Sequence, residues 1–118
     1  MAKHELKVRT QRFAVAVIRF AQTLPCDPVT LVIVRQMTKS GTSVGANYRA
    51  ACRAKSVADF IAKMGIVEEE ADVTLYWFDV LVEAGIVKPS GVADLAKEGN
   101  EILAMVVSSI KTARGRQE

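Results

Sequence analysis

The sequence is poor in the residues on which catalysis and metal binding depend. Its 118 residues include one His, two Cys and three Pro, and only 6% are aromatic. The single His4 cannot supply the paired Glu-x-x-His motifs of a di-metal site in a helical bundle. It is also remote in sequence from Ser40 and Ser43, so no base is apparent beside a nucleophile. We therefore expect no enzyme, and we expect neither a metal nor a cofactor.

The cysteines and the short apolar runs exclude two further classes of protein. Cys26 and Cys52 fall near opposite ends of one expected helix, which separates them by roughly 39 Å. A disulfide needs Cα atoms within about 7 Å, so we expect free thiols and a cytoplasmic protein. Arg19 and Arg35 interrupt the apolar runs, which stay far below the length of a membrane span. We expect no signal peptide and no membrane partner.

The residues that are present favour helices. Half of them are hydrophobic, and apolar residues recur at three- and four-residue steps along four segments. The chain length fits one domain. The pattern predicts an all-α protein with helices over about 3–24, 28–54, 57–84 and 92–113. Because the turns between them are short, we expect an antiparallel, up-down-up-down four-helix bundle.

Turn and cap residues set the expected helix boundaries. Asp27 followed by Pro28 is typical of a helix start, and Ser56 and Ser90 are expected to cap the third and fourth helices. Gly85 is expected to end the third helix in a left-handed conformation.

Small residues occupy the middle of the second helix, where a bundle normally has large ones. Gly41 and Gly45 each cost about 1 kcal/mol in helix propensity, which close approach of a neighbouring backbone would offset. Ser40, Ser43 and Asn47 fall along one side of this segment. They could bind a ligand or a partner backbone. We prefer a structural role in which they bond helix carbonyls or one another and fix the helix register.

Charge is divided unevenly along the chain. Residues 1–55 carry ten Lys or Arg and two acids, whereas residues 56–118 carry six and eleven. The halves could neutralise each other within the bundle or between subunits, or the basic half could face an anionic partner such as RNA. The acidic run 68–72 fits a solvated or a subunit-facing surface. The candidate phosphate contacts are Arg9, Arg12, Arg49, Arg53 and Lys55.

Three consecutive aromatic residues in the third helix cannot all face the core. Adjacent helical positions lie about 100° apart, and Phe78 fits the inner stripe. Tyr76 or Trp77 should therefore point elsewhere. An exposed aromatic side chain favours an oligomer interface, although packing under the edge of a neighbouring helix would also satisfy it.

The second helix also carries a family resemblance. The segments that carry it run from Ser40 to Arg49, from Ala51 to Ser56 and from Asp59 to Ile61. They resemble the four helix bundle protein family, also called the 23S rRNA intervening sequence protein family, and the resemblance covers nearly the whole chain. Ala50 departs from the pattern, since many members have an acidic residue there.

This resemblance implies a bundle, and it also implies homo-oligomers. The family is similar in fold to the accessory protein of diversity-generating retroelements, which forms pentameric rings and binds nucleic acid and a reverse transcriptase. By analogy, RNA, DNA or a reverse transcriptase-like protein is a candidate partner. Our first hypothesis is a non-enzymatic, homo-oligomeric interaction protein that binds RNA or a protein–RNA complex through its basic half. The alternative is a purely structural scaffold without affinity for nucleic acid.

Overall fold

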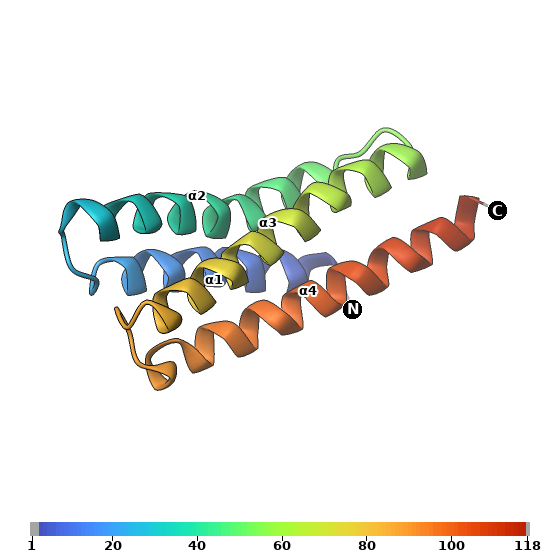
Figure 1. The fold of residues 1–118 in the computed structure, drawn as a ribbon. Coiled ribbons are helices and arrows are strands. Elements are labelled where there is room, and N and C mark those ends of the chain that lie inside the picture. The colour runs from blue at the N-terminus through green and yellow to red at the C-terminus, as the bar shows by residue number, and fades with distance from the viewer. Residues whose placement is uncertain (1–2, 118) are drawn as a thin grey trace.

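A computed structural model describes residues 3–117 of the chain. Within this range all regular structure is helical. The four helices are α1 (Lys3–Ala21), α2 (Pro28–Ala51), α3 (Val57–Glu83) and α4 (Pro89–Gln117). They run alternately in opposite directions and are joined by short turns (Figure 1). The predicted all-α, up-down-up-down bundle is confirmed.

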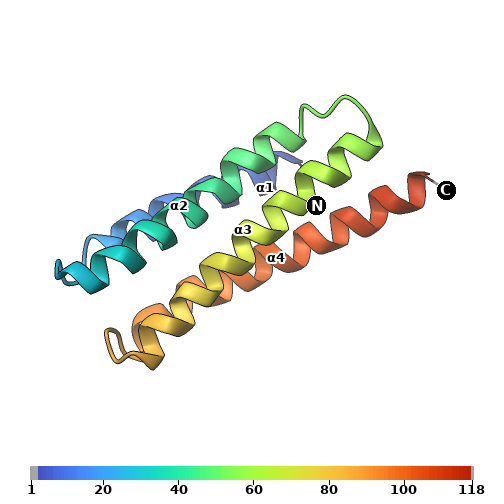
Figure 2. The same ribbon diagram turned by 45° about the horizontal axis from the view of Figure 1, so that its top comes forward.

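The helices pack in sequence order around the bundle. α1 lies against α2, α2 against α3 and α3 against α4, and the contact between α1 and α4 is the least extensive. Two views show α1 beside α2 and α3 beside α4 as antiparallel pairs (Figures 1 and 2). The bundle measures 49 × 22 × 21 Å. This order brings the start of α1, the α2–α3 turn and the end of α4 to one end of the molecule.

Local hydrogen bonds explain the helix boundaries that the sequence predicts. The Asp27 carboxylate accepts the Thr30 N–H at 3.0 Å and caps α2, while Ser56 Oγ accepts the Asp59 N–H at 3.0 Å and caps α3. After α3, Gly85 adopts a φ of 75°. Its N–H donates to the Val82 carbonyl, and the next residue's N–H donates to the Leu81 carbonyl. This is a Schellman motif, which needs the left-handed conformation that glycine adopts without strain.

The structure differs from the predicted boundaries at other helix ends. α1 and α2 end about three residues early, because the N–H groups of Leu24 and Ala54 donate to carbonyls three residues back and form tight turns. α4 begins at Pro89 and continues to Gln117, rather than covering 92–113. Ser90, the expected cap, lies inside the first turn. Proline lacks an N–H and has a helical φ, so it suits the first helical position.

The core is built from the apolar stripes of all four helices. Phe78 is fully buried and packs in T-shaped contacts with Phe13 and Phe20, with ring centroids 6.5 and 6.2 Å away. Tyr76 is 57% exposed and Trp77 is half-buried, so the expected division of the three aromatics is confirmed.

The small residues of α2 permit close packing against α1. A Cβ atom added at Gly41 would lie 2.8 Å from Val17 Cγ1, and one added at Gly45 would lie 3.2 Å from the carbonyl carbon of Thr10. The two helix axes can therefore approach closely along this contact. The close backbone that the sequence led us to expect is present at Gly45, whereas at Gly41 the close neighbour is the side chain of Val17.

Candidate nucleic-acid interface

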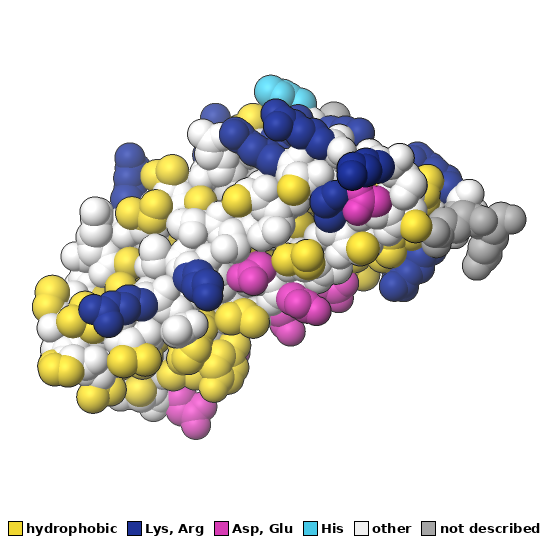
Figure 3. Space-filling model, turned by 90° about the horizontal axis from the view of Figure 1, so that it is seen from above, with side chains coloured by type: hydrophobic (Ala, Val, Ile, Leu, Met, Phe, Trp, Pro, Cys, Tyr) yellow, Lys and Arg dark blue, Asp and Glu magenta, His cyan; other side chains and the backbone are white. Residues whose placement is uncertain are grey.

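Basic side chains converge at one end of the bundle. This basic end comprises residues 3–10, 48–63 and 108–117, which supply ten Lys or Arg against two acids, Glu5 and Asp59. Figure 3 shows Lys and Arg side chains gathered beside the single His, with Asp and Glu along another edge of the face. The basic residues are Lys3, Lys7, Arg9, Arg49, Arg53, Lys55, Lys63, Lys111, Arg114 and Arg116. Such a concentration of cations attracts phosphates.

A groove between α1 and α2 carries part of this charge. Lys7 and Arg49 lie on its two walls, and the small side chains of Ala14 and Ala46 leave it open to a volume of about 570 Å³. The Arg49 guanidinium donates a 2.6 Å hydrogen bond to Gln11 Oε1 across the groove. This contact orients Arg49 without neutralising it.

Arg53 and Lys55 lie where α2 gives way to α3. Both side chains are exposed, and neither forms an ion pair with the described residues 3–117. The turn itself is fixed, because the Asp59 carboxylate accepts the Lys55 N–H at 3.0 Å and the Lys63 ammonium at 2.7 Å. Both bonds hold the pKa of Asp59 below its usual value, and the bond from Lys63 makes the larger contribution. Lys63 thus offsets the charge of Asp59, and the ammonium group of Lys55 remains free to contact a phosphate.

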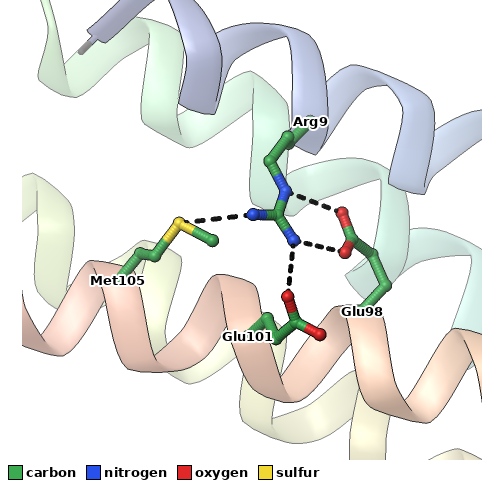
Figure 4. A network of polar contacts seen from close by, with 4 residues as sticks. All are labelled: Arg9, Glu98, Glu101 and Met105. Carbon is green, nitrogen blue, oxygen red and sulfur yellow. Dashed lines mark hydrogen bonds and ion pairs between the residues drawn. The ribbon is translucent and has the colours of Figure 1, made fainter. Parts of the chain in front are cut away.

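Arg9 is engaged within the bundle instead of facing solvent. Its guanidinium makes a two-pronged contact with Glu98, with Nε 3.0 Å from Oε2, and a second ion pair of 3.2 Å with Glu101 (Figure 4). Another N–H points to Met105 Sδ at 3.8 Å. The bond to Glu98 is the main cause that raises the pKa of Arg9. Two carboxylates therefore compensate this cation, which links α1 to α4 across the least extensive contact of the bundle.

Arg12 is exposed but belongs to a different surface. It borders a groove between α1 and α4 whose other walls include Phe13, Leu95 and the carboxylates of Asp94 and Glu98. The structure therefore brings Arg49, Arg53 and Lys55 together and leaves Arg9 and Arg12 apart from them.

The polar side chains of α2 bond the helix backbone. Ser43 Oγ donates to the Lys39 carbonyl at 2.6 Å, and Asn47 Nδ2 donates to the Ser43 carbonyl at 2.8 Å. Ser40 is buried, donates to the Met37 carbonyl, and accepts a 2.8 Å bond from the hydroxyl of Thr74 on α3. Of Ser40, Ser43 and Asn47, only Ser40 makes a polar link to another helix, which fixes the register of α2 against α3.

The sequence did not single out several cations of the basic end. The candidate phosphate contacts predicted from the sequence do not include Lys3 or Lys7 of α1. They also omit Lys111, Arg114 and Arg116, because cations in the last turns of a helix are already explained by its dipole. The topology of the bundle could have indicated them, because the start of the first helix and the end of the last helix lie at the same end.

Exposed apolar side chains gather away from the basic end. Val29, Val32 and Tyr76 are 72%, 57% and 57% exposed. Hydrophobic side chains are prominent at the end of the viewed face opposite to the Lys and Arg group (Figure 3). The other large apolar residues with substantial exposure are Val15, Ile18, Ile66 and Val73, together with Val57, which is the exception because it lies at the basic end.

Both thiols are free, as predicted, with Cys26 exposed and Cys52 half-buried. Among residues 3–117, no three His, Cys, Asp or Glu side chains are grouped closely enough to hold a metal ion. Over the same range, no helix is both long and apolar enough to cross a bilayer.

Comparison with known families tests the family resemblance that the sequence of the second helix suggests. The model of the 23S rRNA-intervening sequence protein family matches residues 3–108. The chain belongs to this family. The match to the 23S rRNA-intervening sequence protein family spans α1, α2, α3 and all but the last turns of α4.

A solved structure supports the same assignment. It is described as a protein of unknown function from the S23 ribosomal protein family of Bacteroides thetaiotaomicron. The two sequences are 33% identical, the alignment covers 90% of this chain and 98% of that one, and the TM-score is 0.84. A comparison with curated proteins finds no match.

Proposed function

We propose that this protein acts by binding instead of by catalysis, as a homo-oligomer that holds RNA at its basic end. The observation that carries the proposal is the convergence at one end of the bundle of eight Lys or Arg that form no ion pair within residues 3–117, once Arg9 and Lys63 are set aside. Phosphate contacts supply most of the affinity in sequence-independent RNA binding and need only such charges. The description of the family as a 23S rRNA-intervening sequence protein is consistent with RNA as the partner.

Exposed apolar surface supports the oligomer. Val29, Val32 and Tyr76 project from α2 and α3, and Val15 projects from α1. Different surfaces that bind head to tail generate a closed ring when the rotation permits it. By resemblance to the accessory protein of diversity-generating retroelements, we propose a pentamer. Its free thiols suit the reducing cytoplasm, where we place this activity.

The decisive experiment removes three cations that form no ion pair within residues 3–117. We expect the triple variant Arg49→Gln, Arg53→Gln, Lys55→Gln to weaken binding of a single-stranded RNA roughly 100-fold at 0.1 M salt. The slope of log affinity against log salt should become shallower by about 2. Fluorescence anisotropy across a salt series measures both quantities.

A matched control changes the same charge at other exposed positions. Arg19→Gln, Arg35→Gln, Lys88→Gln removes three exposed cations that lie outside the basic end. This control should keep most of the affinity. Equal losses in the two variants would rule out the assignment of the site. An oligomer that retains no RNA even at low salt would favour the scaffold function instead, and preferential binding of DNA would identify the other nucleic acid as the partner.

A further inference from the structure

Two adjoining hollows at the basic end have a composition that the binding of an extended strand does not explain. The first, of about 260 Å³, lies between the start of α1, the α2–α3 turn and the end of α4. The second, of about 370 Å³, continues from it toward the side of α4. Both are bordered by Lys3, Phe60 and Arg116. Together they reach the range of about 300 to 1,000 Å³ that is typical of small-ligand sites.

The first hollow is strongly cationic. Lys3, Lys55 and Arg116 reach it from three different elements, and none forms an ion pair within residues 3–117. Asp59, which lies four residues after Lys55, does not line it and is bonded to Lys63 at 2.7 Å. A phosphomonoester carries close to two negative charges at neutral pH and offers three acceptor oxygens, whereas a phosphodiester within a strand carries one charge. Three converging cations therefore favour the monoester.

The second hollow has the character of a nucleoside site. Ser108, Ser109 and Thr112 line it from α4, with the Thr112 hydroxyl bonded to the Ser108 carbonyl at 3.1 Å, and Phe60 and the almost fully buried Tyr48 line its other side. Hydroxyls can bond the sugar and the base edges, and an aromatic ring can stack on a base. Burial, and then a contact to the Cys52 thiol, raises the pKa of Tyr48.

We propose that these hollows together bind one nucleotide that ends in a phosphomonoester. The phosphate lies among Lys3, Lys55 and Arg116, and the nucleoside lies against Phe60 and the α4 hydroxyls. The ligand is either a free nucleoside monophosphate or the phosphorylated end of an RNA strand. In the second case the inference deepens the proposed function and rests on it.

The test compares ligands that differ only in the phosphate. One 12-nucleotide RNA is prepared with a 5′-phosphate, with a 3′-phosphate and with hydroxyl groups at both ends, and AMP is compared with adenosine. We expect at least one phosphorylated ligand to bind the full-length protein tenfold or more tightly than its unphosphorylated counterpart in calorimetric titration. Equal affinities within every pair would overturn the inference and leave general RNA binding intact.

Two double variants locate the effect. Lys3→Gln, Arg116→Gln removes two cations from the hollow and should abolish the preference for the phosphate. Lys111→Gln, Arg114→Gln removes the same charge from the same end at exposed positions that line neither hollow. This second variant should keep the preference, and loss of the preference in both would refute the site. Circular dichroism checks that each variant is folded.

The comparison of these ligands also distinguishes this inference from the proposed function. If AMP and phosphorylated RNA bind while hydroxyl-ended RNA does not, the hollows stand and general RNA binding fails. If phosphorylated RNA binds and AMP does not, the strand end is the ligand. If AMP competes at equal affinity with phosphorylated RNA, the mononucleotide alone accounts for binding.

Discussion

Two helical glycines, Gly41 and Gly65, show how the surroundings of one residue set the sign of its contribution. A Cβ atom at Gly41 would lie 2.8 Å from Cγ1 of Val17, a fully buried side chain with one preferred rotamer in a helix. A Cβ atom at Gly65 would meet nothing within 4 Å. At Gly41 the low helix propensity of glycine is offset by close packing on Val17, whereas at Gly65 nothing offsets it.

Alanine at these positions should change stability in opposite directions. Gly65→Ala should raise the free energy of unfolding by about 0.5 to 1 kcal/mol, because alanine favours the helix and contacts nothing new. Gly41→Ala gains about 1 kcal/mol of propensity but incurs about 1 to 3 kcal/mol of overpacking. We expect a net loss of up to about 2 kcal/mol. Urea unfolding followed by circular dichroism measures both, and stabilisation by Gly41→Ala would contradict the tight packing of α1 on α2.

At the scale of the element, local chemistry explains which helix boundaries the sequence predicted. Asp27, Ser56 and Gly85 act within a few residues of themselves, so their roles could be deduced from the sequence. The ends of α1 and α2 depend on how the last turn tightens, and the start of α4 depends on whether Pro89 or Ser90 is the better first residue. Those alternatives differ by a single turn of backbone, and the apolar pattern does not distinguish them.

The cap at Asp27 should make stability depend on pH. Hydrogen bonds from the Thr30 N–H and then from the Thr30 hydroxyl lower the pKa of Asp27 below its usual value. A carboxyl whose pKa is lowered by folding stabilises the protein above its unfolded value, and that contribution is lost as the pH falls through the folded value. Asp27→Asn keeps an acceptor for the Thr30 N–H but does not titrate. It should therefore lose less stability than the wild type between pH 5 and pH 3.

Urea unfolding at the two pH values measures this difference. Asp72→Asn is the matched control, since it removes the same charge from an exposed position that forms no hydrogen bond with residues 3–117. The control should keep the acid dependence of the wild type. Identical pH dependence in Asp27→Asn and the wild type would show that the cap does not couple folding to protonation.

At the scale of the whole molecule, the distribution of charge follows the bundle and not the sequence halves. The chain reads as a basic half followed by an acidic half, yet Lys111, Arg114 and Arg116 of the second half join the basic end. Arg9 of the first half is compensated by Glu98 and Glu101. Counting along the chain could not reveal this, because antiparallel packing brings distant segments together. The candidate site was therefore predicted only in part, at Arg49, Arg53 and Lys55.

The separation of a basic end from exposed apolar surface leads to the last prediction. If the apolar residues of α2 form the contact between copies, Val29→Lys, Val32→Lys should dissociate the proposed pentamer, because burying two unpaired ammonium groups costs several kcal/mol per interface. The elution mass from light scattering should fall from five chain masses to one. Helix content should be unchanged, since both side chains are exposed within the single chain.

Asn100→Lys, Ala104→Lys adds the same charge to exposed positions of α4 and should leave the assembly intact. A wild-type protein that elutes as a monomer would contradict the oligomer itself. If the pentamer persists in the Val29→Lys, Val32→Lys variant, the contact between copies lies on another surface of the bundle. The variant also tests how the two ends cooperate: a monomer with one basic end should bind RNA more weakly than a ring that presents five of them, because linked sites raise the effective concentration of the bound strand.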